Sequence, residues 1–225
     1  MTESDRQGFP SSINFLIASV TLVLLSLVLL LCVVAIRLTG RGPVFYRQPR
    51  AGQHGRPFVL WKLRTMVQGS DPVGVGEAVT AADPRVTRVG RVLRALSLDE
   101  LPNLFNVLTG EMAIVGPRPT LPAQIELYTP HQRHRLDVRP GLTGWAQING
   151  RAGIPWEERI ELDVWYVENR SVALDLKICL LTLPSLLRRR RSEHLAVDPY
   201  AGSAPDSPLR KAAEQERDTD PSSRL

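Results

Sequence analysis

Two adjacent carboxylates, Asp99 and Glu100, stand at the start of a predicted helix. Arginines flank them in the sequence, with Arg94 before the pair and Arg118 after it, between two prolines. Arginine side chains bind phosphate oxygens, and a carboxylate can attack phosphorus or hold a metal ion. The pattern is therefore typical of an enzyme that works on phosphate groups.

The Asp99–Glu100 pair admits two interpretations from the residues alone. Acidic side chains at a helix N-terminus stabilise the helix dipole, which needs no catalysis. A helix N-terminus also binds anions, and a carboxylate held there stays ionised and can attack phosphorus. Its neighbour can hold Mg²⁺, which takes one or two carboxylates together with substrate phosphates. The nearby arginines favour the second interpretation.

Further charged side chains could complete a phosphate site. Lys62 and Arg64 alternate with apolar residues, so they would project from one strand face, although a solvated strand edge also explains them. Prolines fix the backbone around Arg118, and Arg151 closes a glycine-containing segment in a similar way. Asp163 lies between apolar residues of a predicted helix, and such an acid needs a partner, either an arginine or a metal ion.

The elements that would position these residues begin with an uncharged apolar run from Ile13 to Ile36. Its length is close to the roughly 20 residues that cross a membrane core. A secretory signal is disfavoured because the residues before the run are not basic and no small-residue cleavage site follows it. Arginines cluster after the run, so the larger C-terminal part should be cytoplasmic.

The composition fits one domain with appendages. The chain has 225 residues, 43% of them hydrophobic, and a net charge of +5. This basic balance suits phosphorylated substrates, anionic membranes or nucleic acid, and the two distant cysteines form neither a disulfide framework nor a zinc spacing. We expect a polar N-terminus (1–12), a membrane helix (13–38), a catalytic domain (39–191) and a disordered tail (192–225).

The patterning predicts an α+β, mainly helical fold with a compact catalytic domain and amphipathic helices at the membrane interface. Short strands over 44–46 and 58–61 should form a β-hairpin, and residues 87–95 an amphipathic helix with a basic face. The segment 69–83 should be a loop. Ser97 should cap the next helix, with Glu100 completing a capping box.

Five short motifs follow one another along the chain and indicate a family: GPVFYRQ at 42–48, KLRTM at 62–66, SLDELP at 97–102, GPRP at 116–119 and PGLTGW at 140–145. Through them, the chain from about Asn14 to Leu187 resembles the bacterial sugar transferases, also called monotopic phosphoglycosyl transferases or undecaprenyl-phosphate sugar phosphotransferases. The resemblance implies transfer of a sugar 1-phosphate from a nucleotide sugar, of the UDP type, to polyprenyl phosphate. That step initiates exopolysaccharide or glycoconjugate synthesis.

The resemblance also implies a covalent mechanism. Asp99 would attack the phosphate next to the sugar, nucleoside monophosphate would leave, and the lipid phosphate would then displace the aspartate. Glu100 would hold Mg²⁺ together with Asp99 and would also adjust the reactivity of the Asp99 carboxylate. The remaining implied site residues are Lys62, Arg94, Arg118 and Arg151 around the phosphates and Asp163 as a supporting acid.

One departure from the family pattern concerns the apolar run. Many relatives carry a Ser-Pro pair that breaks this helix and returns the chain to the same membrane face, whereas Ser26 and Leu27 stand here. Without proline the helix loses its strongest kink signal, so both a re-entrant and a spanning path stay open. The expected partners are a nucleotide sugar, polyprenyl phosphate and lipid of the cell membrane, without nucleic acid. No block of further spanning helices precedes Ile13, so we expect a minimal catalytic form.

Two other functions stay open on the residues. Residues 86–108 could form two short helices that imitate a DNA-binding helix-turn-helix in a membrane-tethered regulator. Asp99 and Glu100, at the start of the would-be reading helix, would repel DNA phosphates. The chain could also be an inactive scaffold of polysaccharide assembly, although every implied catalytic position retains its chemistry.

Overall fold

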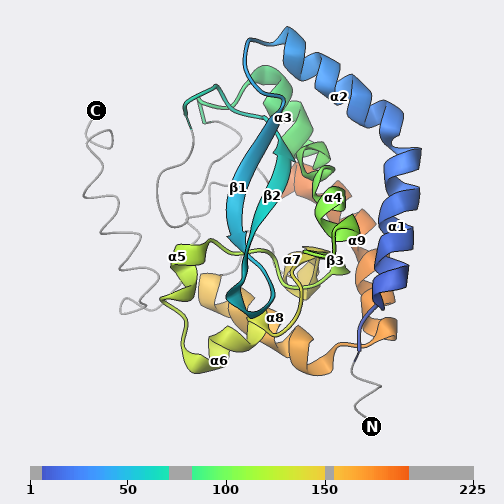
Figure 1. Ribbon diagram of the computed structural model, residues 1–225, viewed down its shortest axis with the longest axis vertical. Coiled ribbons are helices and arrows are strands. Elements are labelled where there is room, and N and C mark those ends of the chain that lie inside the picture. Colours follow the sequence, from blue (N-terminus) through green and yellow to red (C-terminus); the bar gives the residue numbers. More distant parts are fainter. Residues whose placement is uncertain (1–6, 71–82, 150–154, 193–225) are drawn as a thin grey trace.

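The computed structural model describes residues 7–70, 83–149 and 155–192, with side chains as far as Ser185. Within these ranges the fold is α+β and mainly helical, as predicted (Figure 1). The predicted hairpin is confirmed: β1 (Phe45–Ala51) pairs antiparallel with β2 (Pro57–Leu63), across the short turn η2 (Gln53–Gly55). A parallel pair that the pattern does not predict joins β3 (Ala113–Val115) to β4 (Gly141–Thr143).

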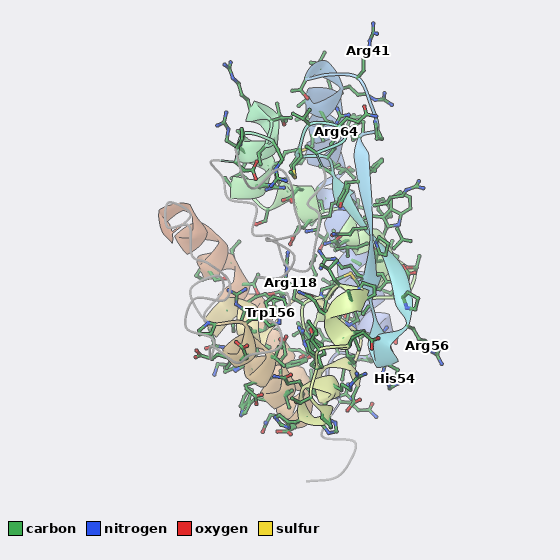
Figure 2. All side chains as sticks on the ribbon, turned by 90° about the vertical axis from the view of Figure 1, so that its left-hand side faces the viewer. Arg41, His54, Arg56, Arg64, Arg118 and Trp156 are labelled. Carbon is green, nitrogen blue, oxygen red and sulfur yellow. The ribbon has the colours of Figure 1, made fainter. Side chains whose placement is uncertain are left out.

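The β1–β2 hairpin lies at one outer face of the fold, with the helices behind and beside it (Figures 1 and 2). These helices include the two of the apolar run, α1 (Ser11–Leu24) and α2 (Ser26–Leu38). The later elements are α3 (Arg88–Ala95), η3 (Leu98–Glu100), α4 (Asn103–Leu108), α5 (Pro122–Ile125), α6 (Pro130–Arg133), η4 (His134–Leu136), α7 (Trp145–Asn149), α8 (Trp156–Asn169) and α9 (Val172–Ser192). Most of the predicted loop at 69–83, residue 151 and the predicted tail after 192 lie outside the described residues.

The apolar run is not the single helix expected over 13–38. It forms α1 and α2, which meet at Leu25 with a bend of 61°. No described helix is by itself long and apolar enough to cross a membrane, whereas the bent pair together has the required length and composition. At the break the Ser26 hydroxyl donates to the Val23 carbonyl at 2.8 Å, a local bond that competes with the helical pattern where proline is missing.

Large apolar side chains on these two helices face outward. Val23, Leu24 and Leu38 are 73%, 74% and 82% exposed. On α9, Leu180 and Leu183 are 68% and 67% exposed. An apolar surface of this extent marks a contact with a membrane or another partner, because soluble surfaces do not leave so many large side chains in water.

The inner face of α1 packs on α4 and β3 and fastens the apolar pair to the rest of the fold. Ala18 is fully buried there in a cluster that also contains Leu104 and Ile178. Asn14 is buried in the same region, where its amide donates to the Phe9 carbonyl at 2.8 Å and its Oδ1 accepts the Ile114 backbone N–H at 2.7 Å. This side chain therefore ties the start of α1 to β3.

Replacing Asn14 with alanine should destabilise the fold by about 1–3 kcal/mol, because the buried Ile114 N–H loses its acceptor. Denaturant unfolding of the detergent-solubilised protein measures the change. The matched control is Asn169→Ala, which removes an exposed amide bonded to the Trp165 carbonyl, with an expected cost below about 0.5 kcal/mol. Equal losses in the two variants would contradict the assigned role of Asn14.

Candidate active site

The Asp99–Glu100 pair lies in a short 3-10 turn, η3, and not at the start of a regular helix. Ser97 precedes the turn with a φ of 55°, in the left-handed region that few residues other than glycine adopt. In this conformation its side chain does not cap the turn, so the predicted capping box is wrong. The helix itself, α4, begins at Asn103. This helix has six residues, of which Asn103, Leu104, Asn106 and Val107 are buried.

Glu100 lies between two cations from distant parts of the chain. Its Oε1 atom accepts from Lys62 Nζ at 2.9 Å and from Arg118 Nη2 at 2.6 Å. Burial favours the neutral acid, but Arg118 and Lys62 outweigh it and hold the pKa of Glu100 well below its usual value. Glu100 in turn raises the pKa of Arg118. The carboxylate is therefore ionised and joins β2, η3 and the turn after β3.

A small pocket, partly open to solvent, lies beside this triad. Three cationic side chains line it, from Arg50, Lys62 and Arg118, against the single carboxylate of Glu100. Asp99 precedes Glu100 in the same turn, is 9% exposed, and lies near enough to Arg118 for its charge to raise the arginine pKa. The region thus offers a carboxylate beside an excess of positive charge, which suits a bound phosphate group.

Three of the predicted phosphate-binding residues lie elsewhere or outside the described ranges. The Arg64 guanidinium donates to the carbonyl oxygens of Gly40 at 3.2 Å and Arg41 at 3.0 Å. Figure 2 shows it beside Arg41, well apart from Arg118. Arg64 therefore satisfies backbone carbonyls after the end of α2 and does not line the pocket, so its role in phosphate binding stays a prediction. Arg94 lies on α3, where its Nε donates to Thr65 Oγ1 at 2.9 Å, and Arg151 is not among the described residues.

Asp163 is buried at 2% exposure and does not line the pocket. Of its two predicted partners the structure supplies an arginine, because Arg135 Nη2 donates to Asp163 Oδ2 at 2.5 Å. The same guanidinium donates to the Tyr128 hydroxyl and, at 3.1 Å, to the backbone carbonyl of Arg118. Asp163 thus supports the site indirectly, through Arg135. The sequence did not single out Arg135. What could have found it is Asp163, an acid between apolar residues that needs a partner.

The turn that carries Arg118 is also fixed by the contact between two glycine motifs. The Gly116 N–H donates to the Thr143 carbonyl at 2.9 Å, and the Gly141 N–H donates to the Pro117 carbonyl at 2.8 Å. A Cβ atom on Gly141 would lie 2.1 Å from the Gly116 nitrogen, so the two backbones approach more closely than any side chain allows. The β3–β4 pair therefore presents Arg118 from a rigid backbone.

The donor set fits a magnesium ion that is shared with substrate. Within the described ranges, no group of three or more His, Cys, Asp or Glu side chains could hold a metal ion by itself. Asp99 and Glu100 offer carboxylate oxygens, and the Oδ1 atom of Asn103, which lines the pocket, is buried without a hydrogen-bond donor. Oxygen ligands of this kind, completed by phosphate oxygens, are those that Mg²⁺ prefers.

Comparison with known proteins identifies the family of this chain. The family model described as bacterial sugar transferase matches residues 6–189. The chain is 46% identical over 181 residues to the uncharacterized sugar transferase EpsL of Bacillus subtilis, covering 79% of this chain and 88% of that protein. The chain belongs to the bacterial sugar transferase family.

Two further relatives carry more specific names. The UDP-glucose:undecaprenyl-phosphate glucose-1-phosphate transferase of Caulobacter vibrioides is 47% identical over 178 residues, covering 76% of this chain and 66% of that protein. The exopolysaccharide production protein ExoY of Sinorhizobium fredii is 40% identical over 195 residues, covering 80% of this chain and 86% of that protein. The chain thus spans most of ExoY and about two thirds of the Caulobacter enzyme.

Glu100→Gln should make stability less dependent on pH in the acid range. The pKa of Glu100 is lowered in the folded state, so its contribution is fully present above the unfolded value near 4.5 and is lost as the pH falls through the folded pKa. The wild type should therefore be more stable at pH 7, and the difference should shrink on acidification. Melting temperatures between pH 3 and 7 test this, with Glu161→Gln, an exposed acid, as the control. Parallel curves for wild type and Glu100→Gln would contradict it.

Asp163→Ala should cost about 3–5 kcal/mol of unfolding free energy, because Arg135 remains charged and buried without its partner. The double variant Arg135→Met/Asp163→Leu should recover much of this loss, since an apolar pair needs no counterion. Its activity should nevertheless stay about 10- to 100-fold low, because the Arg118 carbonyl has lost its donor. Denaturant unfolding and steady-state rates separate the two effects, and a fully active double variant would refute the positioning role.

Proposed function

We propose that this chain transfers a sugar 1-phosphate from a UDP-sugar to undecaprenyl phosphate, in the initiating step of exopolysaccharide synthesis. The observation that carries the proposal is the Glu100 carboxylate between Lys62 and Arg118, at a pocket of excess positive charge. Asp99 does not line this pocket but precedes Glu100 in the same turn, near enough to Arg118 to raise the arginine pKa. The names of the Caulobacter and Sinorhizobium relatives support the donor, the acceptor and the pathway.

The proposed chemistry has two displacements at one phosphorus atom. A carboxylate oxygen of Asp99 attacks the phosphorus bonded to the sugar, the P–O bond to the other phosphate breaks, and nucleoside monophosphate leaves with the electron pair. A phosphate oxygen of the lipid then attacks the same phosphorus and displaces Asp99. The products are the lipid diphosphate sugar and the regenerated carboxylate.

The pocket side chains would act by position and charge. Arg118 and Lys62 would bind the phosphate oxygens while Glu100 holds both cations in place. Asp99 and Glu100, with Asn103, would hold Mg²⁺, which when bound neutralises charge on the diphosphate. No proton relay is needed for attack by an ionised carboxylate, which fits a pocket whose lining contains no histidine among the described residues.

The apolar surfaces of α1, α2 and α9 support a location at the membrane. Their exposed leucines and valines would enter the lipid, and the arginines that follow the run would lie at the headgroups on the cytoplasmic side. The bend at Leu25 supports a re-entrant path, in which both ends of the apolar pair stay on one face. A lipid-linked acceptor would then reach the pocket without leaving the membrane.

Asp99→Asn should abolish release of uridine monophosphate from UDP-glucose and undecaprenyl phosphate, by about 1,000-fold or more, because an amide oxygen is a poor nucleophile. The variant should still sediment with membranes. Asp137→Asn, at an exposed acid paired with His134, is the matched control and should keep wild-type rates. Mass spectrometry of quenched wild-type reactions should place a hexose phosphate on Asp99. Turnover by Asp99→Asn, or an adduct on another residue, would refute the covalent route.

A further inference from the structure

Arg50, on β1, lines the pocket. It lies on the face of the hairpin that also presents Lys62, and it lines the pocket together with Arg118. Arg47, three residues earlier on the same strand, lies on the outer face instead, where its guanidinium stacks over Trp61 at 4.1 Å. The alternation of β1 therefore directs one of these two arginines into the pocket and the other into solvent.

The partners of Arg50 are all neutral. Its Nε and Nη2 atoms donate to the Gln48 Oε1 atom at 3.2 and 2.6 Å, and its Nη1 donates to the Pro119 carbonyl at 3.3 Å. A guanidinium has five N–H groups, so two of them have no acceptor among the described residues. The three bonds fix the orientation of the fork without neutralising its charge.

Arg50 and Arg118 both line the pocket, and their like charges repel each other. Burial and then the charge of Arg118 lower the pKa of Arg50 to about 10, and the attraction of Glu100 is a smaller effect. Glu100 is bonded to Lys62 and Arg118 and not to Arg50. Two like charges held together in this way are favourable when an anion lies between them.

The Asn103 side chain is a second sign that the pocket is built for a ligand. It is 4% exposed, lines the same pocket, and its buried Oδ1 atom has no donor among the described residues. Native structures seldom leave such an atom unpaired unless a ligand, ion or water completes it. Unused donors on Arg50 and an unused acceptor on Asn103 thus face one space.

We infer that Arg50 binds a phosphoryl group of the substrate jointly with Arg118, as a two-arginine clamp at the pocket. The inference rests on the proposed function and extends it, because it adds a phosphate ligand that the motifs did not indicate. The phosphoryl group belongs to the nucleotide donor or to the lipid phosphate, and both present the same tetrahedral anion. Arginine suits this role because its planar fork binds two phosphate oxygens at once.

The test compares Arg50→Gln, Arg50→Lys and the control Arg47→Gln in the full-length, detergent-solubilised protein. Binding of UDP without acceptor reports on the donor phosphates, and the KM for undecaprenyl phosphate at saturating UDP-glucose reports on the acceptor. Arg50→Gln should weaken one or both by about 10- to 100-fold, with Arg47→Gln within about twofold of wild type. If only the affinity for UDP falls, the clamp binds a phosphate of the donor. If only the KM for undecaprenyl phosphate rises, the clamp binds the lipid phosphate.

The dependence on salt separates charge from structure. Because Arg50 also holds Gln48 and the Pro119 carbonyl, its loss could displace the turn without touching substrate. A lost phosphate contact should make affinity less sensitive to salt in Arg50→Gln, whereas Arg50→Lys should be weakened but keep the wild-type salt dependence. Wild-type affinities for both ligands, or weakened binding with unchanged salt dependence in Arg50→Gln, would overturn the inference. If Arg50→Gln does not fold, wild-type affinity in Arg50→Lys would overturn it. Failure of wild type and Arg47→Gln to turn over would instead refute the proposed function.

Discussion

The arrangement of the site depends on one carboxylate oxygen that two cations share. Glu100 Oε1 bonds to both Lys62 and Arg118, which lie 38 and 18 residues away along the chain. The Glu100 charge offsets the repulsion between the two cations, and the two cations keep the carboxylate ionised. The three-way contact therefore fixes β2, η3 and the turn after β3 relative to one another, while still leaving the pocket with more positive than negative charge for a substrate to neutralise.

Backbone contacts give this arrangement its precision. Arg118 follows Gly116, whose backbone lies against Gly141 at a distance that excludes any side chain, and its own carbonyl is bonded to the buried guanidinium of Arg135. Arg135 is held in turn by Asp163 and Tyr128. The buried Arg135–Asp163 pair thus holds the backbone of Arg118, whose side chain binds Glu100. These contacts fix the position of the Arg118 guanidinium, which the proposed phosphate-binding role requires.

The sequence predicted the residue types of the site better than their placement. Asp99, Glu100 and Arg118 could be found because acids next to proline-fixed arginines are unusual, and the hairpin followed from its short apolar strands. The backbone of Arg64 still pairs with Val44, but its side chain bonds to the Arg41 carbonyl after α2, a long-range contact that strand alternation does not predict. The prediction of a capping box was wrong because the backbone of Ser97 is left-handed. That conformation is set by the tertiary structure and not by local propensity. Arg50 and Arg135 were missed for a similar reason, since only strand register and packing show which of many arginines faces inward.

The apolar helices and the phosphate site share one strand. Asn14 bonds to the backbone of Ile114 in β3, and β3 continues directly into the turn that presents Arg118. The start of α1 is held a second time, because the Phe9 N–H donates to Asp175 at 2.6 Å and Tyr166 donates to the other oxygen of the same carboxylate. These buried polar contacts are costly unless every group is satisfied, so they fix the angle at which α1 leaves the domain. If the exposed leucines of α1 and α2 enter a membrane, their depth would set the height of the pocket above the lipid headgroups. In the proposed function the acceptor phosphate stays at the membrane surface, so the pocket would have to lie at that height.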